Sequence, residues 1–169
     1  LSLFQLELYW YKCIKSILLS NFDIRNNNMS KVQFLFHDRS STLIQRNNLK
    51  IFITELFKRE GATLRHLTYV FCSDEYLLGI NKQFLNHDFY TDIITFDLSS
   101  QEIGIKGEVY ISIDRIKENA SKHKTAYKDE LHRVIFHGAL HLCGYKDKKK
   151  IQIEKMRMKE DEYLMMYFE

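Results

Sequence analysis

Two histidines and an aspartate lie close together near the C-terminal end of this chain. His137 and His141 are four residues apart, and the segment continues through Gly144 to Asp147 in the pattern H-x-x-x-H-x-x-G-x-x-D. On a helix, side chains four positions apart project from the same face, so both imidazoles can reach a single metal ion. Imidazole nitrogen is a common ligand of Zn²⁺. The spacing therefore predicts a helix that presents two zinc ligands.

Gly144 and Asp147 extend this pair toward a site with three ligands. A glycine just after the second histidine can adopt the left-handed conformation that ends a helix and reverses the chain. The reversal can bring the Asp147 carboxylate back to the metal as an anionic ligand. Three protein ligands leave the fourth position of Zn²⁺ for water, and the pKa of that water falls to about 7 in catalytic zinc sites. The alternative is that Asp147 is a surface acid that balances the lysines around it. These lysines are Lys146, Lys148, Lys149 and Lys150.

Other polar residues near this segment are weaker candidates. His132 is turned away from the ligand face of the helix, and we expect it on the surface or at an interface. Glu130 is expected to be an ordinary exposed acid, with a buried supporting role as the alternative. Asp92 is expected to cap a turn, with a hydrogen bond to a ligand histidine as the alternative. His123 is also a poor candidate, and Cys143 is expected to be a small core residue.

The residue after the first histidine bears on the class of reaction. Zinc peptidases with the same histidine spacing carry a glutamate there, which acts as the general base. In this chain the position is Gly138, which cannot accept a proton. The sequence therefore disfavours a zinc peptidase unless another residue supplies the base.

The histidine segment, with its glycine and tyrosine at 144 and 145, resembles the motif of the YbeY family of bacterial metal-dependent endoribonucleases. Two upstream blocks, 81–96 and 107–112, resemble the family in order and spacing, so the match runs from about Asp74 to Asp147. The resemblance implies a zinc-dependent, single-strand-specific endoribonuclease that acts in 3′-end maturation of 16S ribosomal RNA and in ribosome quality control. It further implies one Zn²⁺ per chain, ribosomal RNA and ribosomal subunits as partners, and a cytoplasmic location.

Two positions depart from the family pattern. Asp147 stands where the family usually has a third histidine, and Leu85 stands where it usually has an arginine implicated in nuclease function. Leucine can neither bind phosphate nor stabilise an anionic transition state. Arg133 and the four lysines at 146 and 148–150 are the candidates for that support and for RNA contacts, and the alternative for the lysines is a solvated turn. A second function, a non-catalytic zinc-containing ribosome-assembly factor, therefore remains open.

Length and composition favour one domain. The chain has 169 residues, a net charge of +3, 45% hydrophobic residues and only 3 cysteines, which excludes a disordered chain and a disulfide-rich secreted scaffold. The separated cysteines favour a reducing compartment, and no apolar run is long enough to span a membrane. We expect residues 1–28 to be an upstream extension, with an amphipathic helix as the alternative, and residues 29–169 to form a single domain.

Hydrophobic periodicity predicts the elements that must position the site. The expected class is α/β (α+β), with one small mixed sheet packed by helices and the metal-bearing helix near the C-terminus. The sequence does not predict the order of the strands. Strands are expected within 30–36, 66–72, 91–98 and 106–113, and helices at 43–59, 74–84 (capped by Ser73), 116–123, 129–143 and 151–168.

Overall fold

The computed structural model describes residues 30–41, 43–100 and 104–169, so the predicted extension at 1–28 lies outside the described residues. Within these ranges there are four strands and five helices, and none of those helices has the length and apolarity needed to cross a membrane. They are β1 (Val32–Phe36), α2 (Arg46–Arg59), β2 (Leu64–Cys72), α3 (Asp74–Leu85), β3 (Ile93–Asp97), β4 (Ile105–Ser112), α4 (Ile113–His123), α5 (Tyr127–Leu142) and α6 (Lys150–Phe168).

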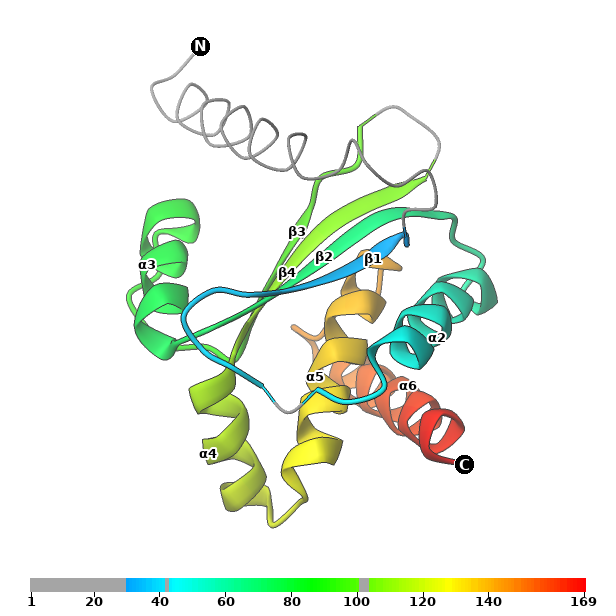
Figure 1. Cartoon of the computed structure of the whole chain (residues 1–169). Coiled ribbons are helices and arrows are strands. Elements are labelled where there is room, and N and C mark those ends of the chain that lie inside the picture. The colour runs from blue at the N-terminus through cyan, green and yellow to red at the C-terminus, as the bar shows by residue number, and fades with distance from the viewer. Residues whose placement is uncertain (1–29, 42, 101–103) are drawn as a thin grey trace. The chain divides into compact units, whose positions relative to one another are not determined.

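The four strands form one mixed sheet in the order β1-β2-β4-β3. β2 runs parallel to both β1 and β4, whereas β3 is antiparallel to β4. Side chains alternate between two covered faces: Tyr69 and Phe71 join the main core with α2, α5 and α6, while Val70 and Cys72 join a smaller core with α3. Figure 1 shows α3 on one side of the sheet and α2, α5 and α6 on the other. The predicted α/β class with a small mixed sheet is therefore confirmed.

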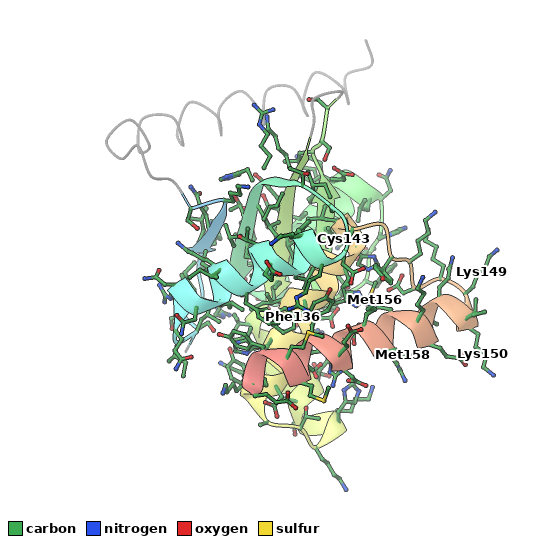
Figure 2. All side chains as sticks on the ribbon, turned by 90° about the vertical axis from the view of Figure 1, so that its right-hand side faces the viewer. Phe136, Cys143, Lys149, Lys150, Met156 and Met158 are labelled. Atoms are coloured by element: carbon green, nitrogen blue, oxygen red, sulfur yellow. The ribbon has the colours of Figure 1, made fainter. Side chains whose placement is uncertain are left out.

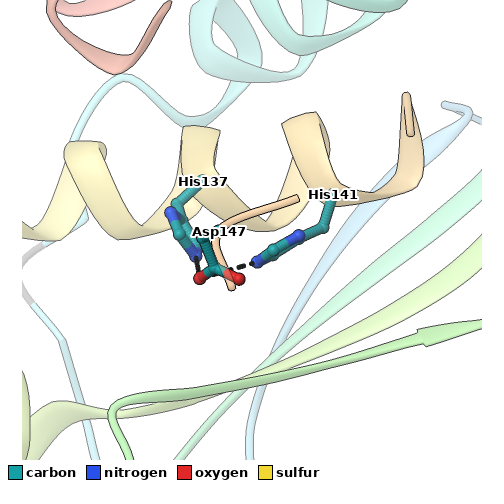
Figure 3. A group of neighbouring side chains, drawn as sticks. All are labelled: His137, His141 and Asp147. Carbon is teal, nitrogen blue, oxygen red and sulfur yellow. Dashed lines mark ion pairs between the residues drawn. The ribbon is translucent and has the colours of Figure 1, made fainter. Parts of the chain in front are cut away.

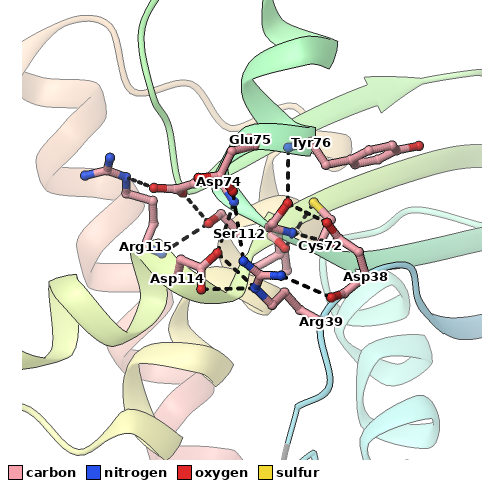
Figure 4. Close-up of polar contacts among 11 residues, drawn as sticks. Asp38, Arg39, Cys72, Asp74, Glu75, Tyr76, Ser112, Asp114 and Arg115 are labelled. Atoms are coloured by element: carbon pink, nitrogen blue, oxygen red, sulfur yellow. Dashed lines mark hydrogen bonds and ion pairs between the residues drawn. The ribbon is translucent and has the colours of Figure 1, made fainter.

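A serine at the carboxyl end of β2 and another at that of β4 begin the helices α3 and α4, within the group of polar contacts shown in Figure 4. The Ser73 hydroxyl accepts a hydrogen bond from the Tyr76 N–H at 3.2 Å, so the predicted cap of α3 is confirmed. Ser112 plays the same part for α4, because its hydroxyl accepts from the Arg115 N–H at 3.1 Å. This second cap explains why α4 begins at Ile113, three residues earlier than predicted.

α5 packs against β3 and β4, and a glycine lies on each side of this contact. A Cβ atom at Gly138 would lie 2.7 Å from Val109 Cγ1 and 3.0 Å from Ile93 Cδ1. From the opposite side, a Cβ atom at Gly107 would lie 2.6 Å from Leu142 Cδ1. A Cβ atom at either position would therefore push a neighbouring side chain aside, so the two glycines let the helix that carries the histidines pack closely on the sheet.

We expect Gly138→Ala to lower the free energy of unfolding. Overpacking a core costs about 1–3 kcal/mol and alanine gains roughly 1 kcal/mol over glycine in a helix, so we expect a net loss of up to about 2 kcal/mol. Urea denaturation measures the difference. Gly79→Ala is the matched control, because Gly79 lies inside α3 and its Cβ would meet no atom within 4 Å. That variant should be equally or more stable than the parent; equal stabilisation of both variants would contradict the close packing of α5.

Candidate metal centre

Three side chains meet beside the last turns of α5, and we call them the His–His–Asp cluster (His137, His141 and Asp147). The Nε2 atoms of both histidines lie 3.6 Å from Asp147 Oδ2. One ligand atom from each residue can be chosen so that all three lie within 4.8 Å of one another. Ligands at 2.0–2.1 Å around a tetrahedral ion are separated by roughly 3.3 Å. Figure 3 shows the carboxylate facing both imidazoles, so the donor set and spacing fit one small divalent cation.

The turn after α5 brings Asp147 to this position. α5 ends at Leu142, and Gly144 has a φ of 93°, the left-handed conformation predicted for it. The Tyr145 N–H donates to the Leu140 carbonyl and the Gly144 N–H to the His141 carbonyl, which is the hydrogen-bond pattern of a Schellman motif. The chain then reverses, and Asp147 lies opposite the two histidines.

Hydrogen bonds to the other ring nitrogens orient both imidazoles. His137 Nδ1 lies 2.7 Å from Glu160 Oε1, and His141 Nδ1 lies 2.9 Å from the carbonyl oxygen of Tyr145. A carboxylate and a carbonyl only accept hydrogen bonds, so each Nδ1 is the donor. In the neutral imidazole this leaves Nε2 with its lone pair directed at the cluster, which is the tautomer a metal ligand requires.

The two histidines differ in their affinity for protons. Burial lowers the pKa of His137, but the hydrogen bond and negative charge of Glu160 outweigh it, so this pKa is raised overall. The pKa of His141 is lowered, first by burial and then by the neighbouring His137. In the metal-free protein His141 is thus the weaker base, and protons compete with a metal ion mainly at His137.

Glu160 is a site residue that the sequence analysis missed. Its side chain is 8% exposed, and besides His137 it contacts Arg133, whose Nη1 lies 3.3 Å from Oε2. The same Arg133 nitrogen lies 2.6 Å from Asp161 Oδ1. The sequence did contain a signal for Glu160. With Met156, Tyr163 and Leu164 it follows the i, i+4, i+7, i+8 spacing of one helix face, and this is the buried face of α6. A carboxylate on an otherwise apolar face indicates a buried partner.

The turn that follows α5 is also anchored from behind. Tyr145 donates its hydroxyl to Glu60 Oε2 at 2.7 Å, and Tyr163 and Lys159 contact the other oxygen of Glu60. Burial raises the pKa of Glu60, but these hydrogen bonds and the lysine charge lower it overall. Glu60 follows α2 and its partners Lys159 and Tyr163 lie in α6, so these two helices anchor the segment whose carbonyl orients His141.

A cleft of about 820 Å³ opens beside the His–His–Asp cluster. Leu85, where the resemblance places an arginine, lines it and is 41% exposed. Of the lysines predicted to contact RNA, Lys148 lines the cleft, whereas Lys146 lines a separate hollow beside Glu60. Lys149 and Lys150 lie where α6 begins and point away from the interior, in contrast to Phe136 and Met156 (Figure 2). The other polar and aromatic lining residues include His87, Phe89, Asp92, Glu130, Arg133 and Glu160.

Two expectations about polar residues were wrong. Glu130 is 4% exposed rather than an exposed acid, because α5 is covered by neighbouring helices along almost its whole length, and burial raises the pKa of this carboxyl. His132 is 2% exposed rather than on the surface; its Nδ1 contacts the Lys128 carbonyl, and its ring stacks on Tyr167. Asp92 accepts a hydrogen bond from Asn119 at the cleft. Cys143 is half-buried and packs against the main core.

Comparison with known proteins gives one consistent result. The family model described as "Endoribonuclease YbeY" matches residues 26–167. A protein of that name from Cytophaga hutchinsonii is 49% identical over 133 residues, covering 79% of this chain and 93% of its own. One from Porphyromonas gingivalis is 45% identical over 138 residues, covering 82% and 91%. The solution structure of TM1509 from Thermotoga maritima superposes with a TM-score of 0.59 at 29% identity, covering 81% of this chain and 89% of that one.

Proposed function

The chain belongs to the YbeY family of endoribonucleases, and on that premise we propose that it cleaves single-stranded RNA with one Zn²⁺ bound by His137, His141 and Asp147. We further propose that it acts in the cytoplasm, on the 3′ end of 16S ribosomal RNA and in ribosome quality control, with ribosomal RNA and ribosomal subunits as partners. The observation that carries the proposal is the His–His–Asp cluster at the wall of an open cleft.

The cluster has the chemistry of a catalytic zinc site rather than a closed structural one. It offers two imidazoles and one carboxylate, and the cleft gives solvent access to the fourth direction. When bound, Zn²⁺ supplies Lewis acidity there and makes water acidic enough to lose a proton near neutral pH. Glu160 and the Tyr145 carbonyl hold the two imidazoles in the orientation that this binding requires.

Cationic side chains of the cleft have separate tasks in this proposal. Arg133 is in contact with the carboxylates of Glu160 and Asp161, so we assign it to holding Glu160 in place rather than to binding phosphate. Lys148 lines the cleft next to Asp147 and is assigned to the RNA backbone. Lys149 and Lys150 point away from the interior, so we assign them at most to RNA that extends beyond the cleft.

Leu85 is the observation that favours the second candidate function. It lies in the cleft with 41% of its surface exposed, so it contacts solvent where a cation would support a developing negative charge. A protein that binds RNA and Zn²⁺ without cleaving either RNA or protein would be the ribosome-assembly factor. The zinc peptidase is disfavoured further, because Gly138 faces the sheet at Val109 and leaves no room for a base.

The test compares zinc-loaded and chelator-treated protein on single-stranded ribosomal RNA, on duplex RNA and on casein. We expect cleavage of the single strand by the zinc-loaded sample only, restored when Zn²⁺ is returned. Binding of RNA without cleavage, with zinc present in stoichiometric amount, would replace this proposal with the assembly factor. Cleavage of casein without effect on RNA would replace it with a peptidase.

Asp147 provides a separate prediction about the metal. We expect Asp147→Ala to weaken zinc binding at least as much as the roughly 10- to 100-fold that losing a ligand-supporting residue costs, since one of the three proposed ligands is lost. Asp147→His should bind zinc as tightly as the parent or more tightly, because imidazole replaces carboxylate as a neutral ligand. Competition with a fluorescent zinc chelator measures both. Unchanged affinity in Asp147→Ala would make Asp147 a surface acid and place the third ligand elsewhere.

A further inference from the structure

Two aromatic residues that follow α3 form part of the wall of the cleft whose lining also includes the metal-bearing helix α5. His87 and Phe89, which we call the aromatic pair, follow α3 and both line the cleft. Their rings stack with centroids 5.0 Å apart and an interplanar angle of 23°. Phe89 is 56% exposed, and the neighbouring Leu85 is 41% exposed. An exposed aromatic ring, backed by a second ring, therefore lies in the same cleft as the His–His–Asp cluster.

The segment that carries this pair is fixed to α3. The Asn81 side chain, itself buried, donates to the Phe89 carbonyl at 2.8 Å, and the His87 N–H donates to the Asn81 carbonyl at 3.2 Å. Asn86 has a φ of 56°, which turns the chain directly after the helix. Because both hydrogen bonds tie this backbone to Asn81 and the Phe89 ring rests on His87, the segment is ordered before any ligand arrives, and less conformational entropy is lost when a ligand stacks on it.

We propose that the aromatic pair is a stacking platform for one unpaired nucleobase of the RNA substrate. This inference rests on the proposed function and deepens it. An open aromatic face beside a phosphodiester-cleaving centre matches the way proteins bind single strands, with bases on aromatic rings and phosphates on cations. Lys148 supplies the cation in the same cleft. A base inside a duplex is already stacked and paired, so the platform would select single-stranded RNA.

The stacking platform also assigns a role to Leu85. Where an arginine would contact the backbone by charge, this chain has an apolar side chain, and it lines the same cleft as Phe89. The part of the cleft formed by Leu85 and the aromatic pair therefore contacts the RNA through the face of a base and not through a phosphate. Its contribution to RNA binding is largely independent of salt.

The test measures binding and cleavage in parallel. Binding of a fluorescein-labelled single-stranded RNA to chelator-treated protein is followed by anisotropy, and cleavage of the same RNA by zinc-loaded protein gives KM and kcat. We expect Phe89→Ala to weaken binding and raise KM roughly 5- to 10-fold, the effect of losing one stacked base, with kcat nearly unchanged. Phe89→Trp should bind at least as tightly as the parent, whereas Phe89→Leu should bind as weakly as Phe89→Ala.

Tyr90→Ala is the matched control, because Tyr90 is adjacent and 48% exposed but its ring faces the Arg115 guanidinium at 4.7 Å. An RNA with one abasic nucleotide then locates the partner. At one position the missing base should weaken binding to the parent protein and have no effect on Phe89→Ala.

The platform would be overturned if Phe89→Ala bound every RNA like the parent, or if Phe89→Leu restored binding fully. Failure of the proposed function looks different. RNA binding that depends on Phe89, with no cleavage by the zinc-loaded parent, would retain the platform and refute the nuclease.

Discussion

The His141→Ala protein should no longer retain one zinc ion per chain after dialysis, and with the zinc it should lose the cleavage of RNA. In the proposed site His141 supplies one of three ligand atoms, and its Nδ1 hydrogen bond to the Tyr145 carbonyl fixes the turn that carries Asp147. One substitution thus removes a ligand and loosens a second. We expect zinc affinity to fall by more than about 100-fold, which exceeds the effect of losing a residue that only supports a ligand. Metal content by atomic absorption and affinity by chelator competition measure this directly.

His123→Ala is the control for this variant. His123 is the last residue of α4, is exposed and does not line the cleft, so its removal takes away an imidazole that is not part of the His–His–Asp cluster. It should bind zinc and cleave RNA like the parent. Circular dichroism before and after zinc addition shows whether His141→Ala is folded. Full zinc content in a folded His141→Ala protein would refute the site as described.

The parts of this molecule that local sequence could predict are those decided within one helix or one turn. The i, i+4 spacing of His137 and His141 predicts a shared face wherever the helix packs. Gly144 likewise predicts the end of α5 and the reversal, because few other residues adopt positive φ at low cost. Ser73 predicts the start of α3 for a similarly local reason, the acceptor that its side chain offers to a free N–H.

What the sequence did not predict depends on contacts between distant segments. The order β1-β2-β4-β3 places β3 at an edge, and no local pattern encodes which strands become neighbours. Glu160 is 23 residues from His137 along the chain, and only the packing of α6 on α5 brings them together. Glu130 and His132 were misplaced because α5 is buried on nearly all sides, whereas periodicity assumes one exposed face.

Glu160→Ala should lower zinc affinity about 10- to 100-fold although Glu160 touches no metal in the proposed site. The carboxylate holds the ring of His137 at 2.7 Å and keeps its proton on Nδ1. Without it, Nε2 of His137 is no longer directed at Asp147. Arg133 is part-buried and would lose one of its carboxylate partners as well, which destabilises the folded state. Glu160→Gln should keep most of the affinity, because its amide oxygen can still accept from Nδ1.

Asp161→Ala is the control that shows whether Glu160→Ala lowers zinc affinity by releasing the His137 ring or merely by removing a negative charge. Asp161 is the next residue and is 66% exposed; it pairs with the same arginine at 2.6 Å, whereas the hydrogen bond to His137 comes from Glu160. It should bind zinc within about twofold of the parent, since exposed ion pairs contribute little free energy. If Asp161→Ala and Glu160→Ala weakened zinc binding equally, the effect would be long-range electrostatic attraction. If Glu160→Gln were as weak as Glu160→Ala, the negative charge of Glu160 would matter more than its hydrogen bond.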